Sequence, residues 1–197
     1  MAPLIAFVML AFIEAVTVVG PPYPPNAIDG GTVVAVLHVS AGSVDRIDIL
    51  QGDEPFVPPV QSALGRWRFK DSEAGNVLVV VNFRAPTLYS AGSPARKIAP
   101  ARSVPGLAYP EKVIDPAYPP NSLAEGSVVL DLDLSETGSV SKARILQGLG
   151  SLTEACVSAV RKWLFIPARD KKGIATASKA YAVCVVRRPI LSPQVPQ

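Results

Sequence analysis

The segment SVVLDLDL at residues 127–134 alternates apolar and polar side chains and determines how the surrounding chain is interpreted. Val128, Leu130, Leu132 and Leu134 fall on one face, with Val129, Asp131 and Asp133 on the other. A period of two over eight residues predicts a half-buried β-strand. SETGS at 135–139 follows, and its Gly138 suits the positive φ of a hairpin turn. The sequence therefore predicts a hairpin whose second strand runs over 140–147.

A helix and a third strand are predicted after this hairpin. GLG at 148–150 interrupts the strand, and Ser151 and Glu154 have the spacing of a capping box. Apolar residues then recur at helical spacing and form one stripe: Leu152, Cys156, Ala159, Val160 and Trp163. Pro167 ends the helix. The run AYAVCVV at 180–186 is rich in strand-forming residues and predicts the third strand.

The same order of segments occurs earlier in the chain. The matching pairs are YPPN at 23–26 and 118–121, GTVV at 31–34 and GSVV at 126–129, ILQG at 49–52 and 145–148, and WRF at 67–69 and WLF at 163–165. A period of about 95 residues is too long for a solenoid repeat, so each copy is expected to be a small domain. We predict one domain at 23–84 and a second at 118–188.

These elements predict an α+β fold class with two tandem domains. Each domain should be a three-stranded antiparallel sheet (β-β-α-β) with its helix packed on one face. A short helical crossover places the third strand beside the first, which gives the strand order 2-1-3. The third strand of each domain is then left at an edge of its sheet.

Composition and proline content define the remaining segments of the 197-residue chain, which contains 20 prolines and only 18% charged residues. Prolines cluster in 85–117, predicted as a linker, and in 189–197, predicted as a tail.

Residues 1–20 are apolar except for Glu14 and predict a signal peptide or membrane anchor. The alternatives are a misplaced start and a segment packed against the folded domains. A net charge of +3 does not indicate nucleic-acid binding.

No group of residues predicts catalysis, a cofactor or a metal site. His38 is the only histidine, and no serine and aspartate are placed to complete a triad with it. Asp131 and Asp133 share a strand face, but no third ligand accompanies them. The sequence therefore predicts a protein that is not an enzyme.

The second copy resembles the C-terminal domain of TonB-type proteins. The resemblance rests on its Tyr-Pro pair, on GSVV and GSV at 126–129 and 138–140, and on AVRKWLFIPA at 159–168. The first copy departs from the pattern at 70–72 and has prolines at 55, 58 and 59 near the start of its helix. The resemblance implies a periplasmic protein, soluble or anchored to the inner membrane, that binds an extended segment of an envelope protein such as an outer-membrane transporter. The alternative it implies is a compact energy transducer for transport through outer-membrane receptors.

The third strand of the second copy is the predicted binding edge. It lacks proline and inward-pointing charge, which normally protect an edge from strand addition. The predicted partner-binding residues are Tyr181, Ala182, Val183, Cys184, Val185 and Val186. The same edge could form a homodimer, and the linker, the first domain or a second copy of the chain could instead cover it.

The two cysteines predict a disulfide. Cys156 lies on the helix stripe, and Cys184 lies on the strand expected beneath it, while Val60 occupies the position in the first copy that matches Cys156. An oxidising compartment favours pairing. Two buried free thiols are the alternative.

Overall fold

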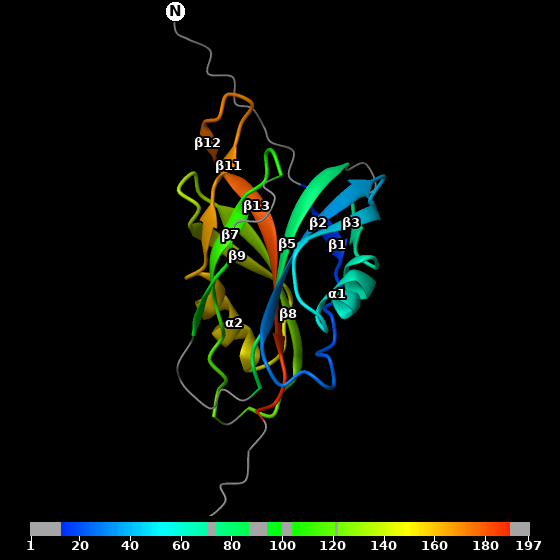
Figure 1. The fold of residues 1–197 in the computed structure, drawn as a ribbon, viewed down its shortest axis with the longest axis vertical. Coiled ribbons are helices and arrows are strands. Elements are labelled where there is room, and N and C mark those ends of the chain that lie inside the picture. The colour runs from blue at the N-terminus through cyan, green and yellow to red at the C-terminus, as the bar shows by residue number, and fades with distance from the viewer. Residues whose placement is uncertain (1–12, 71–73, 87–93, 100–103, 121, 190–197) are drawn as a thin grey trace, which may run out of the picture.

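The computed structural model describes residues 13–70, 74–86, 94–99, 104–120 and 122–189. Its strands are β1 (Ala15–Thr17), β2 (Gly31–Ser40), β3 (Ser43–Gln51), β4 (Arg68–Phe69), β5 (Gly75–Phe83), β6 (Ala95–Lys97), β7 (Tyr109–Ile114), β8 (Gly126–Leu134), β9 (Val140–Gln147), β10 (Leu164–Ile166), β11 (Ala168–Arg169), β12 (Ala175–Thr176) and β13 (Ser178–Val186). The two helices described are α1 (Val57–Leu64) and α2 (Leu152–Val160). Eight strands form one sheet in the order β1-β4-β3-β2-β5-β13-β8-β9 (Figure 1).

The predicted fold class, with two separate three-stranded antiparallel sheets, is wrong. The third strands of the two copies, β5 and β13, pair in parallel from Tyr181 opposite Val79 to Val185 opposite Phe83. Over the paired residues 79–83 and 181–185 neither strand carries a charged side chain or a proline that would guard an edge, so each provides the other with a hydrogen-bonding partner. The pairing joins β3-β2-β5 and β9-β8-β13 into one continuous sheet.

The two hairpins carry β-bulges at equivalent positions. In the β2–β3 pair the register skips Asp45 and Leu50, and in the β8–β9 pair it skips Ser141 and Leu146. These residues match one another when the two copies of the sequence are superposed. Bulges bend a strand and increase its twist, so the two hairpins curve in the same way.

The parallel central pair places the two helices on opposite faces of the sheet. Along β13, Ala182 and Cys184 point into the core that contains α2, while Val183 and Val185 point into the core that contains α1. Because β5 and β13 are equivalent strands that lie side by side in parallel, a rotation about the strand direction relates the two halves of the sheet. This rotation puts the helix of one half on the opposite face from the helix of the other half. The central strands are therefore buried on both faces.

A tryptophan anchors each helix-bearing layer. Trp67 and Trp163 are fully buried, and their indole N–H groups donate hydrogen bonds to the carbonyl oxygens of Val19 and Ile114, each at 2.9 Å. The prolines near the first helix fit its start, because proline is tolerated in the first turn, where no intrahelical partner is needed.

Part of the segment predicted as a linker is folded. β6 and β7 form a small sheet with β10, in the order β10-β7-β6, and Val113 and Ile114 are buried in the α2 core. This small sheet covers the face of the central strands that carries Val36 and Leu78.

A buried polar network fastens the end of β5 to this segment. Asp115 is fully buried and accepts hydrogen bonds from Asn82 and Arg96, each at 2.9 Å. Arg84, also buried, donates to the carbonyl oxygen of Pro116 at 2.8 Å, and its guanidinium lies 5.5 Å from the ring centroid of Tyr118. Burial raises the pKa of Asp115, while Arg96 and Asn82 oppose that rise.

Residues 13–20 of the predicted signal or anchor segment pack against the α1 core; residues 1–12 lie outside the described part of the chain. β1 pairs antiparallel with β4, and Ile13, Val18 and Val19 contact buried side chains of that core. Lys70 forms an ion pair with Glu14. Within the described ranges, neither helix has the length and apolar character needed to span a membrane.

Candidate functional site: the gap between β5 and β13

The predicted binding strand is internal to the sheet over most of its length. β13 pairs antiparallel with β8 on one side and parallel with β5 on the other. The six predicted partner-binding residues, Tyr181, Ala182, Val183, Cys184, Val185 and Val186, are all at most 1% exposed. In this fold the first copy covers their free edge.

The N-terminal ends of β5 and β13 separate before this pairing begins. The pairing between the two strands runs over only five residue pairs, and the first of them is Tyr181 opposite Val79. Before that point, residues 75–78 of β5 pair with β2, and residues 178–180 of β13 pair with β8. β2 and β8 lie on the outer sides of the two strands, away from the space between β5 and β13. Figure 1 shows the two strands diverging toward these ends. We call the resulting opening the strand gap.

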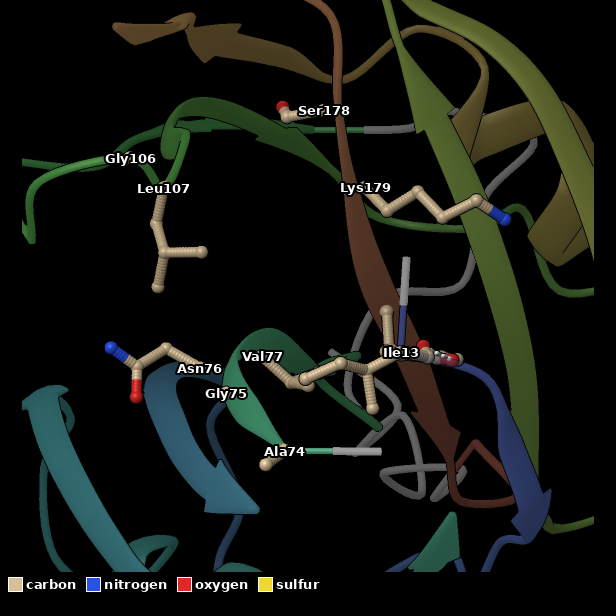
Figure 2. A pocket seen from close by; sticks show the side chains of 10 residues that line it. Ile13, Ala74, Gly75, Asn76, Val77, Gly106, Leu107, Ser178 and Lys179 are labelled. Carbon is tan, nitrogen blue, oxygen red and sulfur yellow. Dashed lines mark hydrogen bonds between the residues drawn. The ribbon is translucent and has the colours of Figure 1, made fainter. Parts of the chain in front are cut away.

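The strand gap has a volume of about 170 Å³ (Figure 2). Its lining residues are Ile13, Ala74, Gly75, Asn76, Val77, Gly106, Leu107, Ser178, Lys179 and Tyr181. Only Tyr181 belongs to the predicted set. The opening depends on where the parallel register starts, and no local sequence pattern reports that position.

The two faces of the strand gap differ in polarity because side chains alternate along its strands. Asn76 and Ser178 share the α2 face with Leu78 and Ala180, and Leu107 packs against that same core. On the α1 face the lining contains Val77, Tyr181 and Ile13, and Lys179 shares this face because side chains alternate along β13.

Ser178 is a buried polar residue with unsatisfied hydrogen-bonding capacity. It is 6% exposed, and among the described residues its hydroxyl oxygen has no hydrogen-bond partner. A buried hydroxyl without a partner costs about 1–3 kcal/mol, so native proteins rarely retain one unless a water or a ligand satisfies it.

The Tyr181 hydroxyl fixes the α1 side of the strand gap. It accepts a hydrogen bond from the Ala15 N–H and donates one to the Ile13 carbonyl oxygen, both at 2.9 Å. The N-terminal segment is thereby held across β13, with Ile13 at the opening.

The charged residues near this site form ion pairs and offer no catalytic arrangement. Lys179 lies 3.3 Å from Asp131 and 3.1 Å from Asp133, and Arg144 also pairs with Asp131. Figure 2 shows Lys179 directed away from the opening. In the described ranges no three metal-binding side chains come together.

The lone histidine takes part in a surface pair on the first hairpin. His38 lies 2.8 Å from Asp48, whose carboxylate also accepts a hydrogen bond from Arg46. The hydrogen bond with His38 lowers the pKa of Asp48, and Arg46 adds to the effect. This arrangement lacks a nucleophile and resembles a cross-strand charge cluster.

The outer edge of the sheet at β9 is guarded against strand addition. Its two bulges fall at Ser141 and Leu146, and the exposed side chains of Lys142 and Arg144 project from it. Bulges and basic residues are the usual protection of an edge strand. At the strand gap, neither the β5–β13 nor the β13–β8 register shows a bulge, and Lys179 is the basic residue among the lining side chains.

Cys156 and Cys184 are neighbours in the α2 core and are free thiols in this structure. A hydrogen bond with Cys156, together with burial, raises the pKa of the Cys184 thiol. The predicted side-by-side placement is therefore present, and the disulfide itself stays a prediction.

We expect the protein isolated under oxidising conditions to contain this disulfide, since the two thiols already lie together in the core. Alkylation under denaturing conditions without reductant, followed by intact-mass measurement, should then show no modified cysteine. After reduction, two modified cysteines should appear. Two alkylated thiols in the unreduced sample would rule the bridge out.

One segment of the chain matches a protein-family model. Residues 115–183 match the model of the Gram-negative bacterial TonB protein C-terminal family. The matched segment contains β8, β9, α2, β10 and most of β13, so it supports the resemblance for the second copy. It does not extend to residues 23–84, and the tandem relationship stays a prediction. Searches of the curated proteins and of the solved structures found no match.

Proposed function

We propose that the chain is a non-catalytic, TonB C-terminal-like protein of the bacterial cell envelope that binds an extended segment of a partner protein by strand addition. The observation that carries this proposal is the match of residues 115–183 to the model of the TonB C-terminal family, which supports an envelope role of TonB type. Within the described residues, the side chains offer interacting surfaces and ion pairs, with no metal-binding cluster.

The strand gap is the part of β13 that suits strand addition. An added strand binds through its backbone N–H and C=O groups, so it needs strand edges whose own groups face it. Over residues 75–78 and 178–180 the two facing edges are not paired with each other. From Tyr181 onward, a partner would first have to displace β5.

We propose a periplasmic location for the folded part, with an envelope protein such as an outer-membrane transporter as the partner. The family to which residues 115–183 are similar supports this location and class of partner. Coupling to an energy source would require an attachment to the inner membrane in addition to this binding site.

Photo-crosslinking tests the proposal on the full chain. Benzoyl-phenylalanine would replace Asn76, an exposed residue at the strand gap, or Lys142, an exposed residue on β9 that serves as the matched control. After incubation with a Gram-negative outer-membrane fraction, the variant at 76 should crosslink to an extended periplasmic segment of one envelope protein. The absence of crosslinks from both positions would contradict the proposed function, whereas crosslinks from 142 alone would move the binding surface to the outer edge.

A further inference from the structure

The turn between β11 and β12 exposes basic and apolar side chains together. We call residues 169–174 the hairpin tip. Ile174 is 60% exposed, and the side chains of Arg169, Lys171 and Lys172 are exposed as well. Three basic residues against the single acidic Asp170 give the hairpin tip a net charge of +2. Among the residues that the structure describes, neither lysine of the tip forms an ion pair.

Hydrogen bonds within the turn fix the shape of the hairpin tip. The Asp170 carboxylate accepts hydrogen bonds from the backbone N–H groups of Lys172 and Ile174, at 2.8 and 2.9 Å. The Arg169 guanidinium donates to the carbonyl oxygen of Gly173 at 2.7 Å, and this glycine has the positive φ of 80° that the turn requires. The acidic group is therefore engaged with the backbone, while the two lysines and the isoleucine face solvent.

The hairpin tip lies at the end of the molecule where the described chain begins. β12 ends at Thr176, two residues before β13 begins at Ser178. Ile13 and Ser178 line the same opening, and Figure 1 shows the hairpin projecting from this end of the sheet. Residues 1–12, which precede Ile13, contain no charged or polar side chain. This apolar segment therefore joins the folded part at the end that carries the basic hairpin tip.

From these observations we infer that the hairpin tip binds the surface of an anionic phospholipid bilayer. Lys171 and Lys172 contact the lipid phosphates, and Ile174 enters the boundary between headgroups and acyl chains. A single short apolar segment holds a protein at a membrane only reversibly, and a basic patch beside it provides the second attachment. An acidic protein segment would match the charge of the tip but would give no role to the exposed isoleucine or to the apolar residues 1–12. Binding at this surface requires no strand addition.

Cosedimentation of the full chain with vesicles tests this surface. One set of vesicles is pure phosphatidylcholine, and the other contains equal parts of phosphatidylcholine and phosphatidylglycerol. The wild type should bind the anionic vesicles more tightly. The double variant Lys171→Gln, Lys172→Gln should bind them about 25-fold more weakly, because each basic residue near an anionic bilayer contributes about fivefold to the binding constant. Its affinity for pure phosphatidylcholine should be unchanged.

Two further variants separate the hairpin tip from overall charge. The double variant Arg187→Gln, Arg188→Gln removes the same charge at the opposite end of β13, ~30 Å away along its nine residues, and should leave the affinity for both kinds of vesicle nearly unchanged. Ile174→Ser should weaken binding to the anionic vesicles about tenfold, since it removes the apolar side chain that enters the bilayer. The unfolding transition should be the same in all variants, because the altered side chains lie at the surface.

Equal affinity of the wild type for the two kinds of vesicle would overturn the inference, and so would an equal loss from the lysine pair and the arginine pair. Benzoyl-phenylalanine in place of Lys172 separates lipid from protein. A crosslink from this position to one envelope protein, without any preference for anionic vesicles, would assign the hairpin tip to an acidic protein segment instead. The crosslinking experiment at Asn76 reports separately on the proposed function, because that residue lies on β5.

Discussion

A chain that begins at residue 20 should be less stable than one that begins at residue 13 by about 4 kcal/mol or more. The loss follows from the contacts of the N-terminal segment. The buried indole N–H of Trp67 loses the Val19 carbonyl oxygen, and the Tyr181 hydroxyl loses its hydrogen bonds with residues 13 and 15. Each buried polar group left unpaired costs about 1–3 kcal/mol, and the apolar burial of Ile13 and Val18 is lost in addition.

Urea unfolding of the two truncated chains measures this difference directly, since both lack residues 1–12. Val16→Ala in the longer chain is a suitable control, because Val16 is 66% exposed. Equal unfolding midpoints for the two truncations would show that residues 13–19 contribute nothing to stability. That result would also allow a signal-peptide cleavage near residue 20.

Asp115→Ala should destabilise the protein by about 3–5 kcal/mol, the usual cost of removing one partner from a buried ion pair. The substitution leaves Arg96 and Asn82 without their common acceptor and removes a charge that faces Arg84. Asp133→Ala is the matched control, since the Asp133 side chain is 40% exposed and pairs at the surface with Lys179. That control should cost about 1 kcal/mol or less.

The pH dependence of stability offers a second test of this carboxyl group. Burial raises the pKa of Asp115 in the folded state above its unfolded value. Stability from such a group is present below the unfolded pKa and is lost as the pH rises through the folded pKa. The unfolding free energy of the wild type relative to Asp115→Asn should therefore decrease as the pH rises above about 4. A constant difference across this range would contradict the raised pKa.

The sequence predicts the local elements well because their signals are local. The alternation at 127–134, the turn at Gly138 and the stripe that ends at Trp163 each correspond to an element or a buried face. The helix residues predicted for both copies, including Val60 and Cys156, are buried.

The sequence does not predict how the two copies meet. Residues 180–186 of β13 look like a binding edge because they lack charge and proline. The same features suit a strand that pairs within its own chain. Proline content likewise favours a linker at 85–117, although Val113 and Ile114 supply enough apolar surface to join the core. The strand gap depends on the start of the β5–β13 register, which is a long-range property without a local sequence signal.

Because β5 pairs in parallel with β13, a partner strand that binds along Tyr181–Val185 has to displace β5. A strand tethered in the same chain acts at an effective concentration of the order of millimolar when its linker is short and flexible. Side chains of β5 are in addition buried in both cores of the sheet. A free partner present at micromolar concentration would need a correspondingly tighter intrinsic affinity to replace β5 along Tyr181–Val185. β5 thus occupies the position beside Tyr181–Val185 that an added partner strand would take.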